Sequence, residues 1–166
     1  MSTTATPPFQ AFLDAERDVV WRYLASMLGA IDAEDCFQET FIAALRAYPR
    51  LTPGSDRRAW VLTIAHRKAL DAHRARARRA QPVADVAALE PCGAATAGAH
   101  APALAHDEEL WRAVGALPAR QRSAVVLRYV ADLPHREIAS AIGCSEDAAR
   151  RSLHEGLTKL RKVVEV

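Results

Sequence analysis

The stretch that decides the fold runs from Asp32 to Arg79 and reads DAEDCFQETFIAALRAYPRLTPGSDRRAWVLTIAHRKALDAHRARARR. It predicts an acidic amphipathic helix, a turn at Pro53-Gly54, and an apolar helix whose C-terminal part is rich in arginine. Residues 32–45 carry four carboxylates and no Lys or Arg, whereas residues 66–79 are strongly basic. This polarity predicts one surface for a protein partner and another for a nucleic acid.

The local pattern also predicts where these two helices begin and which sides they bury. Asp32 is expected to be the N-cap of the first helix, and Ser55 that of the second. Apolar residues at steps of three and four predict one buried face on the first helix, made of Phe37, Phe41, Leu45 and Tyr48. Pro49 is expected to end that helix.

The flanking sequence predicts further helices. Residues 9–28 have helical apolar spacing and end near Gly29, and residues 80–106 have no periodicity and predict a flexible linker. From residue 107 onward, short helices lead to a turn at Gly143 and a basic helix capped by Ser145, which is a helix-turn-helix pattern. Tyr129 is expected to point inward in an earlier helix, over residues 120–130. The fold class is therefore all-α, with domains at residues 9–79 and 107–166.

Composition excludes several classes of function. The chain has 166 residues and a net charge of only +2, so its basic character is local. Its three cysteines are far apart and predict reduced thiols rather than a metal site or a disulfide. No apolar run approaches the roughly 20 residues of a membrane span. We therefore expect a cytoplasmic protein without membrane insertion.

Catalytic patterns are also missing from the sequence. The six histidines form no HExxH motif, and there is no GxSxG motif or P-loop. His66 and His73 lie beside arginines and are expected to contact solvent or phosphate. The sequence predicts no catalytic residues, no metal, no cofactor and no enzyme activity.

The chain resembles a known family in two places. Residues 32–51 and 58–71 closely resemble region 2 of bacterial sigma factors of the extracytoplasmic-function (ECF, group IV) type, within the sigma-70 family. The segment LPARQRSAVVLRYVADLPHREIASAIGCSEDAARRSLHEGLTKLR resembles their region 4. The resemblance implies a subunit that directs core RNA polymerase to promoters and initiates strand opening, under the control of an anti-sigma factor.

The resemblance also implies which residues contact which partner. The acidic helix would dock on the β′ clamp of core polymerase, and region 4 would lie near the β flap. The docking residues would be Asp32, Glu34, Asp35, Gln38 and Glu39. The minus-ten element, duplex and then melted non-template strand, would be bound by Leu51, Pro53, Gly54, Ser55, Arg57, Arg58, Trp60, Arg67, Asp71 and Arg74. The minus-thirty-five element would be bound by Ser145, Arg150, Arg151, Ser152, His154 and Glu155.

Four positions depart from the family pattern. Arg67 stands where Asn is usual, Glu155 where a basic residue is common, Gly156 where Ala is usual, and Pro134 where Ser is frequent. A carboxylate at position 155 repels phosphate but can accept from cytosine N4. These departures bear on promoter sequence and on the affinity of region 4.

Two alternatives remain open at the level of sequence. One is an ordinary helix-turn-helix repressor or activator that binds duplex DNA alone. The other is a sigma-like protein that has lost promoter function and acts only through protein contacts.

Overall fold

The computed structural model describes residues 7–79 and 105–164. The N-terminal half holds α1 (Phe9–Leu28), α2 (Ala30–Ala47), the short 3-10 helix η1 (Tyr48–Arg50) and α3 (Arg57–Arg79). The C-terminal half holds α4 (Ala105–Ala116), α5 (Ala119–Tyr129), α6 (His135–Ile142) and α7 (Glu146–Val164). The described residues contain helices and no strand, which confirms the all-α prediction.

A single residue separates α1 from α2. The Gly29 N–H closes α1 on the Ala25 carbonyl at 2.9 Å, and the Gly29 carbonyl accepts from the Ala33 N–H at 3.0 Å. Gly29 has φ of +82°, a conformation that side-chain-bearing residues avoid. Because Gly29 serves both helices, α2 begins two residues before Asp32. The predicted Asp32 N-cap is therefore wrong, and Asp32 instead lies in the first turn of α2.

The second predicted cap is also displaced by one residue. The Asp56 carboxylate, rather than the Ser55 hydroxyl, accepts from the Ala59 N–H at 3.0 Å at the start of α3. Asp56 therefore occupies the N-cap, and the loop before it turns at Gly54, with φ of +85°, as the sequence predicts. Ser145 does cap α7, since its hydroxyl accepts from the Ala148 N–H at 3.2 Å.

The apolar faces of the helices meet in one continuous core. Tyr23, Leu24 and Met27 of α1 and Leu62 of α3 are fully buried in the N-terminal half, as are Leu127 and Ile138 in the C-terminal half. All belong to one cluster of buried side chains. Tyr129, expected to point inward, is 64% exposed, so that prediction is wrong.

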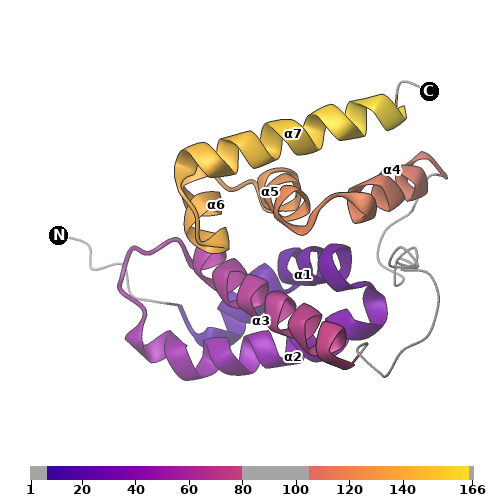
Figure 1. Ribbon diagram of the computed structural model, residues 1–166. Coiled ribbons are helices and arrows are strands. Elements are labelled where there is room, and N and C mark those ends of the chain that lie inside the picture. The colour runs from indigo at the N-terminus through magenta and orange to yellow at the C-terminus, as the bar shows by residue number, and fades with distance from the viewer. Residues whose placement is uncertain (1–6, 80–104, 165–166) are drawn as a thin grey trace.

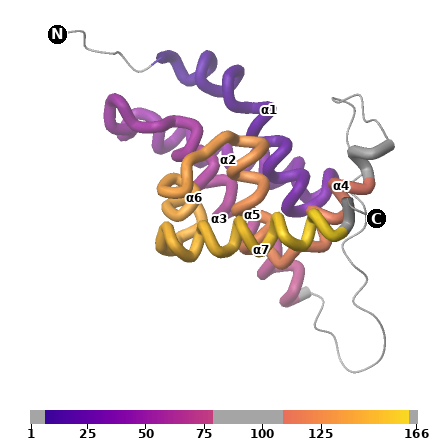
Figure 2. Tube along the Cα trace, turned by 90° about the horizontal axis from the view of Figure 1, so that it is seen from above, coloured from indigo at the N-terminus to yellow at the C-terminus, as the bar shows by residue number. Residues whose placement is uncertain are grey.

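The two halves pack directly against each other. Figure 1 shows α4, α5, α6 and α7 as one layer above α1, α2 and α3, and Figure 2 shows this layer from above. The contacts between halves join α5 to α1, α6 to α3, and α4 to α1. The predicted linker lies outside the described residues except for Ala105 and His106, which open α4. Within the described ranges, no helix has the length and apolar composition needed to cross a bilayer.

Candidate nucleic-acid and protein interfaces

The outer side of α2 carries all five predicted docking residues. Asp32, Glu34, Asp35, Gln38 and Glu39 are each exposed. Two of them also contact α3, because Asp32 pairs with Arg76 at 3.1 Å and Glu39 pairs with Lys68 at 2.8 Å. Exposed pairs of this kind contribute about 0–1 kcal/mol each, so they orient the carboxylates without removing them from solvent.

Apolar side chains complete this surface, and the sequence analysis missed them. Ile31 is 90% exposed, Ile42 51% and Leu45 54%, so the prediction that Leu45 is buried is wrong. Together with Asp35 and Gln38 they follow one another at steps of four, three, four and three, which places all five along one side of α2. We call these five residues the α2 outer stripe. Exposed branched apolar residues at this spacing are typical of a protein-binding surface.

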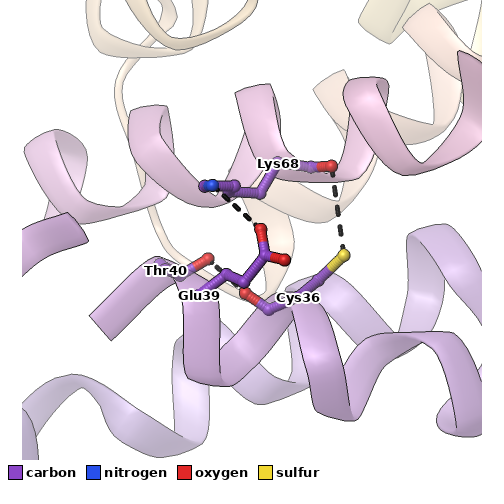
Figure 3. A network of polar contacts seen from close by, with 4 residues as sticks. All are labelled: Cys36, Glu39, Thr40 and Lys68. Carbon is purple, nitrogen blue, oxygen red and sulfur yellow. Dashed lines mark hydrogen bonds and ion pairs between the residues drawn. The ribbon is translucent and has the colours of Figure 1, made fainter. Parts of the chain in front are cut away.

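The opposite side of α2 is fixed against α3. Figure 3 shows the contacts: the Cys36 thiol donates to the Lys68 carbonyl at 3.9 Å, and Lys68 pairs with Glu39. The Thr40 hydroxyl donates to the Cys36 carbonyl at 2.7 Å within α2. Burial raises the pKa of the Cys36 thiol, and the carboxylates of Glu39, Asp32 and Asp35 raise it further. Cys36 is therefore a neutral packing residue.

The loop between η1 and α3 presents the first of the predicted minus-ten residues. Pro53 and Gly54 are exposed, whereas Leu51 and Ser55 are half-buried. Trp60 is half-buried below the loop. Its ring lies 5.9 Å from that of Phe12 and 6.2 Å from that of Tyr48, in a cluster that also includes Phe9. Trp60 thus anchors the loop to α1 and keeps only part of its ring surface accessible.

Arg57 and Arg58 lie where the two halves meet. Arg58 Nε donates to Glu16 Oε2 at 2.8 Å, and this carboxylate is mostly buried. Both arginines line an open surface pocket of about 320 Å³, together with Glu16, Asp56 and the α5–α6 loop residues Ala131, Asp132 and Leu133. The start of α3 therefore faces the C-terminal half.

The outward side of α3 carries a basic stripe. Arg67, Asp71 and Arg74 are exposed at steps of four and three, and Arg74 donates to Asp71 at 3.3 Å. Nothing in the C-terminal half covers these three side chains, because they remain exposed in the packed molecule. With two guanidinium groups and one carboxylate, this stripe has a net positive charge that suits phosphate contacts.

The two histidines of α3 point the other way, so the expectation that they contact solvent or phosphate is wrong. His66 is buried, and its Nδ1 shares a hydrogen bond of 2.7 Å with the Tyr23 hydroxyl. Burial, and then the charge of Arg67, lower the pKa of His66 from 6.5 to about 4. His73 Nε2 lies 3.1 Å from the Met27 carbonyl, which can only accept, so Nε2 carries the proton.

In the C-terminal half, α6 and α7 form the helix-turn-helix. Gly143 takes a left-handed conformation with φ of +69° in the turn, as predicted. Arg150, Arg151, His154 and Glu155 are exposed along α7. Ser152 is only 8% exposed, so its hydroxyl does not lie on the outer side with the others. Gln121 of α5 donates to Glu155 at 2.8 Å and holds that carboxylate in place.

The comparisons with known proteins identify the family of this chain. Residues 12–79 match the model of Sigma-70 region 2, and residues 107–160 match that of Sigma-70, region 4. The ECF RNA polymerase sigma factor SigD of Mycobacterium tuberculosis is 33% identical over 158 residues, covering 90% of this chain and 73% of SigD. This chain belongs to the ECF sigma factors. The predicted resemblance is confirmed.

Other relatives support the same family. The sigma factor CarQ of Myxococcus xanthus is 33% identical over 144 residues, covering 86% of this chain and 80% of CarQ. Among solved structures, RpoE of Bartonella quintana in complex with the anti-sigma factor NepR shares the fold with a TM-score of 0.76 at 21% identity, covering 95% of this chain and 97% of that chain. ECF sigma factors are transcription initiation factors rather than enzymes, so this chain directs polymerase to promoters.

The region 2 match spans most of α1 to α3, and the region 4 match spans most of α4 to α7; these two halves are called region 2 and region 4 below. The structure groups the predicted docking residues on α2 and the predicted minus-thirty-five residues, apart from Ser152, on the exposed side of α7. It divides the predicted minus-ten residues between the exposed edge of α3 and the half-covered start of that helix. Ile31 and Ile42 are visible in the sequence as apolar residues outside the predicted buried face of α2, whereas the apolar spacing assigns Leu45 to that face.

Proposed function

We propose that this ECF sigma factor docks on core polymerase through the α2 outer stripe. The η1–α3 loop and α3 bind the minus-ten element, and α7 binds the minus-thirty-five element. The observation that carries the proposal is the pairing of two unlike surfaces on adjacent helices: acidic and apolar on α2, cationic on α3. An ordinary helix-turn-helix regulator has no need of the first surface.

Docking through α2 follows from its mixed chemistry. The carboxylates of Glu34 and Asp35 favour a basic partner surface and speed association. Ile42 and Leu45 supply exposed apolar surface whose burial stabilises the complex. The proposed partner surface is the β′ clamp, and region 4 would contact the β flap. This part of the proposal places the protein in the cytoplasm with its polymerase.

Minus-ten recognition would combine the loop and the helix edge. A flipped base of the non-template strand would enter beside Leu51 to Ser55, at an unstacking cost of a few kcal/mol that pocket contacts offset. Arg67 and Arg74 would hold phosphates along α3, with Asp71 available to base edges. Trp60 would act mainly by anchoring the loop, because its ring already packs on Phe12 and Tyr48.

Minus-thirty-five recognition would place α7 in the major groove. Ser145, Arg150, Arg151 and His154 would contact the DNA, and Glu155, oriented by the hydrogen bond from Gln121, would accept from cytosine N4. The buried Ser152 would support α7 from behind. We include an anti-sigma factor as a partner, because the sigma factor RpoE, which has the same fold, was solved in complex with the anti-sigma factor NepR.

The decisive experiment compares core binding by matched charge reversals. Asp35→Arg removes a carboxylate from the α2 outer stripe, and Asp14→Arg makes the same change on the exposed side of α1. We expect Asp35→Arg to weaken binding to purified core polymerase at least tenfold and Asp14→Arg to leave it unchanged. Run-off transcription on a pool of random promoters then reports the sequence choice of Arg67 and Glu155.

The other outcomes identify the two alternatives. Equal core affinity of both variants would remove α2 from the docking surface. Failure to bind core, together with tight binding of duplex DNA by the free chain, would indicate an ordinary regulator. Core binding without any promoter-specific transcript would indicate a sigma-like protein that has lost promoter function.

A further inference from the structure

A residue of α5 holds one of the carboxylates of α7. Gln121 donates through Nε2 to Glu155 Oε2 at 2.8 Å. Gln121 is half-buried, whereas Glu155 is exposed. The adjacent Gly156 lets the two backbones come close, since a Cβ there would lie 3.5 Å from both the Cβ and the carbonyl oxygen of Gln121. The packing of α5 on α7 therefore fixes where the amide meets the carboxylate.

The hydrogen bond leaves the other end of the amide unpaired. An ionised carboxylate only accepts hydrogen bonds, so the Gln121 amide must turn its NH2 group toward Glu155. Its Oε1 is then buried and has no hydrogen-bond partner among the residues that the structure describes. Leaving a buried acceptor unpaired costs free energy of the same order as a hydrogen bond to a charged group contributes. The pair therefore adds little to the stability of the fold, and its main effect is to orient the carboxylate.

Two cations on α7 compete for the same carboxylate. Arg151 and Lys159 lie four residues before and four residues after Glu155, and both are exposed. Opposite charges at this spacing are neighbours on a helix surface and attract each other. In the described part of the chain, however, no ion pair includes Glu155, Arg151 or Lys159. The hydrogen bond from Gln121 thus leaves the charge of Glu155 uncompensated and Arg151 available for DNA.

An oriented carboxylate without a cation partner suits one base. In the major groove, cytosine presents its N4 amino group as a donor, whereas guanine and thymine present acceptors that repel a carboxylate. Adenine presents its N6 donor beside the N7 acceptor. Glu155 therefore favours cytosine only if its second oxygen is held toward the base edge. A carboxylate that swings to Arg151 or Lys159 loses that direction.

We propose that Gln121 is a positioning residue for promoter choice: by holding Glu155 away from Arg151 and Lys159, it makes that carboxylate select cytosine in the minus-thirty-five element. This inference rests on the proposed function, which places α7 in the major groove. Part of the promoter specificity then originates in α5, outside the helix-turn-helix.

The test removes the amide and keeps the length of the side chain. Gln121→Met in the full-length chain abolishes the donor and the unpaired Oε1 together. Gln10→Met is the matched control, because Gln10 also donates through Nε2 to a carboxylate, that of Asp14 at 3.0 Å, on the exposed side of α1. Glu155→Ala identifies the base pair that Glu155 reads. Each protein is combined with core polymerase, and run-off transcripts are counted from the promoter that the wild type uses best, with every minus-thirty-five base varied in turn.

We expect the wild type to prefer cytosine about tenfold at one base pair, the scale of one good side-chain contact to a base. Glu155→Ala should lose this preference, and Gln121→Met should reduce it to about twofold or less while the preferences at the other positions stay the same. In the Glu155→Ala background, Gln121→Met should change nothing further, because it acts through that carboxylate. Gln10→Met should match the wild type.

A separate measurement keeps loss of folding apart from loss of positioning. Urea unfolding should show that Gln121→Met is as stable as the wild type, because the variant loses the hydrogen bond and the unpaired acceptor at once. Gln121→Ala, which keeps the Cβ beside Gly156, replaces it if circular dichroism shows that Gln121→Met has lost helix.

Three results would overturn the inference. One is a uniform fall in transcription from all templates in Gln121→Met with the cytosine preference intact, which is what a mere brace between α5 and α7 would give. The others are wild-type base preferences in Glu155→Ala, and an equal effect of Gln121→Met with and without Glu155. If the wild type itself directs no promoter-specific transcript, the proposed function fails and the inference falls with it.

Discussion

At the scale of single residues, the proton affinity of the buried His66 is tied to folding. The unfolded chain has a histidine pKa of about 6.5, and the folded chain lowers it to about 4. Between these values the unfolded state binds more protons, so the free energy of unfolding rises with pH. The stability is complete above pH 6.5 and is lost as the pH falls toward 4.

We predict that the wild-type protein loses about 2 kcal/mol of unfolding free energy between pH 7 and pH 5 from this one side chain. His66→Gln, which keeps a polar group beside Tyr23 without a titrating ring, should remove that part of the pH dependence. Urea unfolding at both pH values measures it. An identical loss in wild type and variant would show that His66 does not titrate as the fold requires.

The same scale explains which predictions from sequence failed. Asp32 and Ser55 are both good capping residues, and so is Asp56, which follows Ser55. Which residue caps a helix depends on where the preceding turn places the backbone. Gly29, with its positive φ, starts α2 two residues early, and the turn through Gly54 brings Asp56 to the cap. Spacing alone does not resolve a shift of one or two residues.

At the scale of the element, Gly156 shows why a glycine is found in the middle of α7. A Cβ at this position would lie 2.9 Å from Val125 Cγ2 and 3.5 Å from the Gln121 carbonyl of α5. Glycine costs about 1 kcal/mol relative to alanine inside a helix. The close approach of α5 and α7 gives a structural reason for this departure from the family pattern.

We predict that Gly156→Ala lowers the free energy of unfolding by about 1 kcal/mol, because overpacking a stiff β-branched neighbour outweighs the gain in helix propensity. In a Val125→Ala background the same change should be stabilising by about 1 kcal/mol, since the opposing methyl is gone. Chemical unfolding of the four proteins completes the cycle. Stabilisation by Gly156→Ala in both backgrounds would show that the helices separate freely at this point.

Helix type and order were predictable from the sequence, whereas the side each helix buries was less so. Apolar periodicity correctly placed Phe41 and Tyr48 in the core. It misplaced Leu45 and Tyr129, because both lie at the edge of an apolar arc and their burial depends on a neighbouring helix. His66 was misassigned for a related reason: its partner Tyr23 is 43 residues away in the chain.

At the scale of the whole molecule, the packing of the two regions was outside the reach of sequence patterns. Each region has its own local signature, but the contact of α5 with α1 and of α6 with α3 depends on surfaces far apart in the chain. The buried side chains of both regions form one cluster. The unfolding free energies of the regions are therefore coupled.

We predict that the wild-type chain unfolds in one calorimetric transition whose van't Hoff and calorimetric enthalpies agree. Ser123 of α5 is fully buried, and its hydroxyl contacts Met27 Sδ of α1 at 3.5 Å. Ser123→Glu should split the transition into two, because a carboxylate buried at this contact separates the regions and each then melts with only its own core. Differential scanning calorimetry at neutral pH measures this directly, with Thr158→Glu, a change on the exposed side of α7, as the reference. Two separate transitions in the wild type would mean that the shared core adds no cooperativity.

The α2 outer stripe lies on the side of region 2 away from region 4, so a protein partner can reach it while the two regions are packed together. If this stripe is the docking surface, as we propose, polymerase can bind first and promoter DNA second.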